Sequence, residues 1–274
     1  MADKVLTIGI SHPEDKLVSS ILNQKLFIQN RESNASTQSI QLLQKHQVDF
    51  AIVQADIAYK ATRVDDNTSP KLRAVLTLYP EMLAYITHKK ETPINFESSI
   101  KNAKSIAFCD TDTHSTAHTI FTAFDIDCEH KIKNIAEAKV AFQSHEIDGF
   151  ITLRGHPNHQ LSQFITEQNL TLVPLYGKKF DQLASDRGYF IKGGIPEKVY
   201  GVKEDVESIG VKALLLTTQE MDEESVYNIT KLILENIETF KVSDPRYRSM
   251  SVKEMLEGLS IPQHKGAIKA FNAF

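Results

Sequence analysis

The feature that most constrains the fold is a regular alternation between short apolar runs and amphipathic segments. Val5–Ile10, Phe50–Val53 and Gly149–Leu153 have the length and apolar content of buried strands. The segments between such runs place apolar residues at helical spacing, and the clearest one extends from Val226 to Phe240. Strands that alternate with helices indicate an α/β architecture.

Two longer apolar runs divide the chain. The first, Leu72–His88, is read as a pair of strands separated by Pro80-Glu81-Met82, and the second is Val211–Thr217. Because they bracket a complete set of strands and helices, the sequence predicts two lobes with a ligand cleft between them. We expect residues 1–85 plus 212–274 in the first lobe and residues 86–211 in the second. No internal repeat is visible in the sequence.

Composition excludes several classes of protein. The 274 residues are 41% hydrophobic and 24% charged, with a net charge of −4. A protein whose main partner is a nucleic acid needs clustered Lys and Arg, and this chain has no such patch. No apolar run reaches the ~18–20 residues of a membrane span. We therefore predict a globular protein that binds no nucleic acid.

Helix starts and cysteines give local predictions. Asn134 with Glu137, and Ser251 with Glu254, have the spacing of a capping box. Asp222 is placed to cap the helix that follows it. The two cysteines, Cys109 and Cys128, would be able to pair in an oxidising compartment. A buried free thiol is the commoner role, and we favour it.

Polar residues follow several predicted strands, where α/β sheets bind ligands. Gln54 offers a donor and an acceptor, and Asp56 either accepts from an ammonium group or caps the next helix. Helix starts at Asn34–Thr37 and Thr111–Thr116 offer backbone N–H groups to an anion. Asp112 or Thr113 would cap the second of these, while Asp110 and Asp112 favour a ligand that carries a cationic or donor group. The predicted ligand-binding residues are Ser11, His12, Asn34, Ala35, Ser36, Thr37, Gln54, Asp56, Thr113, His114, Ser115 and His156.

The sequence gives weaker support for metal binding and for catalysis. His114 and His118 lie at i and i+4 on one helix face, and His156 and His159 would be able to add ligands. Spacing alone is a weak signal, and a half-buried His118 is the simpler interpretation. We predict no metal and no cofactor. The chain has no nucleophile elbow, P-loop or dinucleotide fingerprint, which favours binding over catalysis.

An ordered set of motifs resembles one family of transport receptors. Residues 34–43 and 48–59 have a small-polar helix start, two leucines, an apolar strand and the pattern Gln-x-Asp-x-Ala-Tyr. Further matches are Gly155-His156-Pro157, the strand around residues 204–215, the helix from Val226, and His264-Lys265-Gly266-Ala267. This arrangement resembles the TAXI family, the solute receptors of TRAP transporters. The loops Ser11–Glu14 and Asp110–Thr116 depart from that family's pattern.

The resemblance implies a fold and a function. It implies a two-lobed periplasmic-binding-protein-like fold of type II and a monomeric receptor that closes on an amino-acid-like or organic-acid solute. It also implies delivery to a TRAP membrane permease and an exported, periplasmic protein whose signal peptide has been replaced by Met1. The alternative is a cytoplasmic ligand sensor or an enzyme on the same fold.

Overall fold

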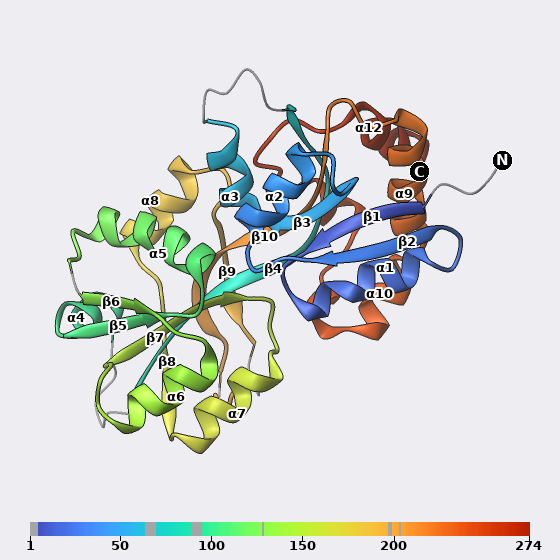
Figure 1. Ribbon diagram of the computed structural model, residues 1–274. Helices are drawn as coiled ribbons and strands as arrows, with labels where there is room; N and C mark the ends of the chain where they lie inside the picture. The colour runs from blue at the N-terminus through green and yellow to red at the C-terminus, as the bar shows by residue number, and fades with distance from the viewer. Residues whose placement is uncertain (1–4, 64–69, 89–94, 128, 197–198, 203) are drawn as a thin grey trace. The chain divides into compact units, whose positions relative to one another are not determined.

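The computed structural model describes residues 5–63, 70–88, 95–127, 129–196, 199–202 and 204–274. The chain divides into two compact units, Met1–Tyr79 with Lys212–Phe274 as unit 1 and Pro80–Val211 as unit 2. Two long strands, β4 (Leu72–His88) and β10 (Val206–Thr218), pass from one unit into the other (Figure 1). Within the described part of the chain, no helix combines the length and the apolar content that a membrane crossing needs.

Unit 1 is an α/β unit whose sheet has the order β2-β1-β3-β10-β4. β1 pairs with β2 and β3 in parallel, whereas β10 runs antiparallel to β3. Its remaining elements are η1 (Pro13–Asp15), α1 (Lys16–Leu22), α2 (Ser36–Gln44), α3 (Ala55–Ala61), α9 (Glu223–Glu235), α10 (Ile237–Ser243), η2 (Pro245–Tyr247), α11 (Val252–Leu256) and α12 (Lys265–Ala273), around the strands β1 (Val5–Ile10), β2 (Phe27–Glu32) and β3 (Phe50–Gln54).

The core of unit 1 joins sheet residues to the apolar faces of its helices. Ile8, Phe50 and Leu215 come from three neighbouring strands, and Ile229 and Ile233 come from α9. All five side chains are essentially inaccessible to solvent. The long apolar stripe that the sequence predicts therefore packs on the sheet as expected for an amphipathic helix.

Unit 2 has the sheet order β4-β7-β5-β6, with β8 also paired to β4 and β9 paired to β10. β5 is parallel to both β6 and β7, and β7 is antiparallel to β4. The elements of unit 2 are α4 (Phe96–Lys101), β5 (Ser105–Phe108), α5 (Thr111–Phe124), β6 (Glu129–Ile132), α6 (Ile135–Gln143), β7 (Gly149–Arg154), α7 (His159–Glu167), β8 (Leu170–Val173), α8 (Lys178–Asp186) and β9 (Ile191–Ile195). The α/β class predicted from the sequence is confirmed.

The segment around Pro80 differs from the sequence prediction. Instead of two strands separated by Pro80-Glu81-Met82, the chain forms one continuous strand, β4. Proline removes a single N–H donor from a ladder, and its fixed φ is compatible with extended backbone. Pairing resumes at once, because Met82 lies opposite Arg154 of β7 and the register continues to Thr87.

The apolar stripe after Asp222 also differs from the prediction, because it belongs to two helices. α9 ends at Glu235 and α10 begins at Ile237, with Asn236 between them at φ −113° and ψ 16°. The Asn236 side chain donates to the carbonyl of Leu232 at 2.8 Å, and its own carbonyl accepts the Phe240 amide. Asn hydrogen-bonds readily to nearby backbone, which is why it interrupts a helix that the apolar spacing alone would continue.

Predicted helix caps are largely confirmed. Asn134 and Glu137 form a reciprocal capping box, with hydrogen bonds of 3.0 and 2.8 Å. Asp222 accepts from the amide of Ser225 at the start of α9. Ser251 accepts from the Glu254 amide, whereas the Glu254 carboxylate pairs with the buried ammonium of Lys212. The second predicted box is therefore only half formed.

The two units share a short turn motif. Residues 44–49, which lead from α2 to β3, and residues 143–148, which lead from α6 to β7, have the common pattern Gln-x-His-x-Val/Ile-Asp. His46 and His145 both adopt left-handed backbone, with φ of 53° and 55°. Asp49 accepts from the Thr7 amide, and Asp148 accepts from the Lys104 amide. In each unit the aspartate thus ties the start of one strand to its neighbour.

Candidate functional site

In unit 1, two predicted segments lie at the carboxyl edge of the sheet. β1 and β3 are parallel, with Ile8 opposite Phe50, so both strands end at the same edge. Ser11 and His12 follow β1, and Gln54 is the last residue of β3. A carboxyl edge of parallel strands is where α/β sheets bind ligands.

Ser36 and Gln54 are in direct contact at this edge. The Ser36 hydroxyl, in the first turn of α2, accepts a hydrogen bond from the backbone N–H of Gln54 at 3.2 Å. Both residues are buried, with 1% and 2% of their surface exposed. The contact fixes the start of α2 against the end of β3, so these two predicted positions are neighbours.

The start of α2 is not capped by a polar side chain. The N-cap is Ala35, which has no side-chain acceptor, so none of the polar residues at 34, 36 and 37 is the N-cap. Asn34 and Thr37 are exposed. The buried carboxylate of Asp56 lies in the first turn of α3 and pairs with Lys60 at 3.0 Å. Asp56 therefore forms an ion pair within α3 and is not the N-cap residue of that helix.

In unit 2, the carboxyl ends of β5 and β7 meet the start of α5. Asp110 follows β5 and is the N-cap of α5, since its Oδ1 accepts from the Thr113 amide at 2.7 Å. The prediction that Asp112 or Thr113 is the cap is therefore wrong. The second carboxylate oxygen of Asp110 lies 2.9 Å from Nη2 of Arg154, the last residue of β7.

Arg154 is the central charged group of this edge. Its Nη2 also donates to Sγ of the buried Cys109 at 3.3 Å. Burial opposes the charge, but Cys109 and Asp110 stabilise it, so the pKa of Arg154 lies above its usual value. The sequence analysis missed this residue. The signal was available, because a lone arginine ends the otherwise apolar run Gly149–Leu153.

The three predicted residues of α5 lie at different depths. Thr113 is buried, and its hydroxyl accepts from the Leu153 amide at 3.4 Å, which ties α5 to β7. Ser115, two residues after Thr113 in the same helix, is half-buried. His114 is also half-buried, and its ring stacks on His130 with centroids 4.5 Å apart. Burial, followed by the neighbouring His130, lowers the pKa of His114.

His156 is held by partners within unit 2. Its Nε2–H donates to the Met82 carbonyl at 3.0 Å, which leaves Nδ1 to accept from the Tyr200 hydroxyl at 2.6 Å. Tyr200 in turn accepts from the Asn158 amide at 2.9 Å. Burial lowers the pKa of His156 to about 4, so the ring is neutral. Both ring nitrogens are thus used to join β4, the turn after β7 and the segment at Tyr200.

The described residues give no metal site. No group of three or more His, Cys, Asp or Glu side chains among them is arranged to hold a metal ion. The ring centroids of His114 and His118 are 6.2 Å apart, and His118 is exposed rather than half-buried as predicted. Cys109 is buried, as the sequence suggests, while Cys128 and therefore the pairing question lie outside the described residues.

Comparisons with known proteins agree on the fold. The chain is similar in structure to the periplasmic aliphatic sulphonate binding protein SsuA from Escherichia coli, with a TM-score of 0.54, 11% identity, and coverage of 98% of this chain and 83% of that one. It is also similar to the alkanesulfonate-binding protein SsuA from Xanthomonas axonopodis pv. citri bound to MOPS, with a TM-score of 0.50, 15% identity, and coverage of 100% and 92%. A histidine kinase sensor domain with similarity to periplasmic binding proteins matches with a TM-score of 0.54, 11% identity, and coverage of 93% and 98%.

The family follows from the sequence. The model of the NMT1-like family matches residues 15–272, which is nearly the whole chain. Membership of the TAXI family in particular stays a prediction. The chain therefore belongs to the NMT1-like family and has a periplasmic-binding-protein-like fold.

Proposed function

We propose that the protein is a solute-binding receptor for a small polar molecule that carries a carboxylate. The observation that carries the proposal is Arg154, a largely buried arginine at the carboxyl edge of β5 and β7, next to the first turn of α5. A guanidinium matches the geometry of a carboxylate, and a helix start adds favourable N–H dipoles.

Asp110, the carboxylate in direct contact with Arg154, is compatible with carboxylate binding. One oxygen of Asp110 is used by the helix cap and the other by Arg154 itself. Its negative charge is thereby compensated locally, and its orientation is fixed. In the proposed receptor Asp110 positions the guanidinium, and Arg154 binds the solute.

In unit 1, we propose that the edge at Ser36 and Gln54 supplies polar contacts to the same class of solute. Ser11, His12 and the first turn of α2 lie along that edge. Short side chains and backbone amides recognise small polar molecules by hydrogen bonding, and such sites lie beyond strand ends in α/β folds. An amino acid or an organic acid has the required donors and acceptors.

The proposed receptor is exported, monomeric and delivers its solute to a TRAP-type membrane permease. The motif order from residue 34 to residue 267 supports this part of the proposal, since it resembles the receptors of those transporters. A ligand sensor is the second candidate, and the similarity in fold to a histidine kinase sensor domain favours it. Fractionation of cells that express the native gene separates the two, because only an exported receptor appears in the periplasm.

A binding screen tests the proposed function. Purified protein is heated with amino acids, organic acids and sugars, since a ligand that binds only the folded state raises the melting temperature. Calorimetry with the ligand found is then repeated on Arg154→Lys, Ser36→Ala and Gln54→Ala. Each should weaken binding by about 1–3 kcal/mol, the usual cost of leaving a buried polar partner unpaired.

Arg187→Lys is the matched control, because Arg187 is an exposed arginine of unit 2 away from the strand ends. The affinity of the Arg187→Lys variant for the ligand should equal that of the unaltered protein. Unchanged affinity in Arg154→Lys would refute the assignment of the carboxylate-binding residue. Absence of any carboxylate among the ligands that raise the melting temperature would refute the proposed solute class.

A further inference from the structure

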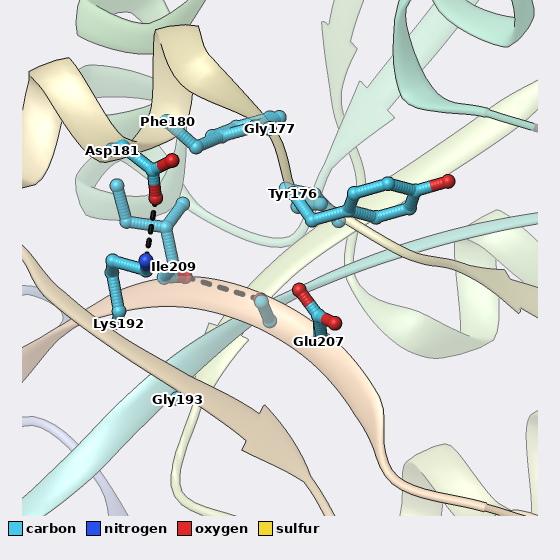
Figure 2. A pocket seen from close by; sticks show the side chains of 10 residues that line it. Tyr176, Gly177, Phe180, Asp181, Lys192, Gly193, Glu207 and Ile209 are labelled. Carbon is cyan, nitrogen blue, oxygen red and sulfur yellow. Dashed lines mark hydrogen bonds and ion pairs between the residues drawn. The ribbon is translucent and has the colours of Figure 1, made fainter.

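Unit 2 contains a pocket of about 250 Å³ that is separate from the edge at Arg154. It lies between the segment after β8, the first turn of α8, β9 and the start of β10 (Figure 2). The Leu175 amide donates to the Glu207 carbonyl at 2.8 Å, which joins two of these walls. Phe180 and Ile209 provide an apolar lining, and both are almost fully buried.

The pocket is lined by more acidic than basic side chains. Lys192 pairs with Asp181 at 2.5 Å on one side (Figure 2). The hydrogen bond to Asp181 raises the pKa of Lys192, so the ammonium is fully charged and its charge is already compensated. Glu207 lies on the other side, and its carboxylate is exposed. It also raises the pKa of Lys192, but less than Asp181 does, and the ion pair of that ammonium is with Asp181. The pocket thus has two carboxylates and one ammonium group.

An exposed aromatic ring lines the same pocket. The Tyr176 side chain is 59% exposed, although its neighbour Leu175 is buried. Figure 2 shows the Tyr176 ring and the Glu207 carboxylate on the same side of the pocket. Next to Tyr176, Gly177 has φ +107°, and apart from its chain neighbours no atom lies within 4 Å of where its Cβ would be.

We propose that this pocket binds a small organic cation, a guanidinium or primary ammonium group on a short apolar body. The cation would lie between the Glu207 carboxylate and the face of Tyr176, since aromatic faces attract cations. The apolar body would contact Phe180 and Ile209. An anion is disfavoured, because the ammonium of Lys192 is already paired with Asp181 and Glu207 repels negative charge.

The size of the pocket sets the size of the ligand. Sites for drug-sized ligands typically span ~300–1,000 Å³, so about 250 Å³ suits a molecule of a few heavy atoms beyond the cationic group. n-Butylguanidinium has this composition. n-Butanol has the same alkyl body without a charge, and butyrate has it with the opposite charge, so the three probes separate charge from hydrophobic contact.

The experiment titrates each probe into the full ¹⁵N-labelled chain and follows amide chemical shifts. n-Butylguanidinium should shift the amides of Tyr176, Gly177 and Glu207 in a saturable manner, whereas butanol and butyrate should not. Glu207→Gln should weaken this binding about tenfold, as expected for a lost charge-assisted hydrogen bond. Tyr176→Leu should weaken it by a smaller factor, because it removes only the aromatic face.

Glu204→Gln is the matched control. Glu204 is another exposed glutamate of unit 2, it precedes β10, and it does not line the pocket. This variant has the same change in net charge and should keep the affinity of the unaltered protein. Equal affinity in Glu207→Gln and Glu204→Gln would overturn the proposal, as would equal shifts from butylguanidinium and butanol. All three variants change exposed side chains, and melting temperatures verify that they are folded.

Discussion

The guanidinium of Arg154 lies 2.9 Å from the carboxylate of Asp110, and this pair joins the end of β7 to the start of α5. Asp110 simultaneously caps α5 by accepting from the Thr113 amide. A single side chain therefore holds the helix start and orients the cation beside it. Loss of the carboxylate and loss of its charge alone should have different consequences.

The first prediction separates these two roles. Asp110→Ala removes both the cap and the ion pair, and should lower the free energy of unfolding by about 2–4 kcal/mol. Asp110→Asn keeps an oxygen for the Thr113 amide and should cost about half as much. Urea unfolding at neutral pH measures both. Equal losses in the two variants would show that the cap contributes nothing.

The second prediction concerns the buried carboxyl of Asp15. Burial raises its pKa to about 6, although Tyr79 donates to it at 2.5 Å and Arg246 lies nearby. The folded state holds this proton more tightly than the unfolded state. The contribution of Asp15 to the free energy of unfolding is therefore at its maximum below about pH 4. It is lost as the pH rises through about 6, which lowers the free energy of unfolding by roughly 3 kcal/mol.

Asp15→Asn should remove that change while keeping an acceptor for Tyr79. The measurement is the urea midpoint of the variant and of the unaltered protein at intervals from pH 4 to pH 7. The difference between the two curves should grow in favour of the variant as the pH rises. Asp186→Asn, at an exposed aspartate, should leave the pH dependence as it is. A constant difference for Asp15→Asn would contradict the raised pKa.

The third prediction has the opposite sign. The pKa of His156 is lowered by burial to about 4, so the unfolded chain binds a proton that the folded protein excludes. Stability from this group is present above about pH 6.5 and is lost as the pH falls toward 4, by roughly 3 kcal/mol. His156→Gln should flatten the acid limb of the stability curve. An unchanged acid limb would argue that the buried ring already becomes protonated above pH 6.

The fourth prediction concerns the contact between α9 and α12. Gly266 lies in the first turn of α12, and a Cβ there would be 2.4 Å from the backbone carbonyl of Glu223. Gly266→Ala must therefore move one helix, which should cost at least about 1–3 kcal/mol. At Gly188 a Cβ would have no atom within 4 Å, so Gly188→Ala is the control and should be close to neutral. Thermal unfolding of the two variants makes the comparison.

Periodicity predicted the α/β class well, because burial on a sheet imposes apolar spacing directly on the chain. It failed where one residue overrides the pattern. Pro80 suggested a break, yet extended backbone accommodates a single proline and β4 continues. Conversely, apolar spacing continues through Asn236, where the helix ends because that side chain bonds to the preceding turn.

The sequence indicates where strand ends and helix starts lie, but not which side chains meet there. Ser36 lies at a helix start and Gln54 at a strand end, and the two are in contact. The residues that cap these helices were not predictable. The N-cap of α2 is Ala35, which has no side-chain acceptor, and the N-cap of α5 is Asp110, one residue before the predicted helix start. Arg154 was missed although it visibly ends an apolar run, because its ion-pair partner lies 44 positions away and the local pattern does not reveal that pair.

The path of the chain through β4 and β10 has a consequence for synthesis on the ribosome. Unit 1 begins first, but its sheet contains β10 between β3 and β4, and β10 enters unit 1 only at Lys212. All of unit 2 has by then been translated, since it consists of one uninterrupted stretch. The sheet of unit 1 is completed only after the last quarter of the chain begins to be translated. Unit 2, by contrast, is able to fold while translation continues. A chain built in this order completes the unit that holds Arg154 before the unit that holds Gln54.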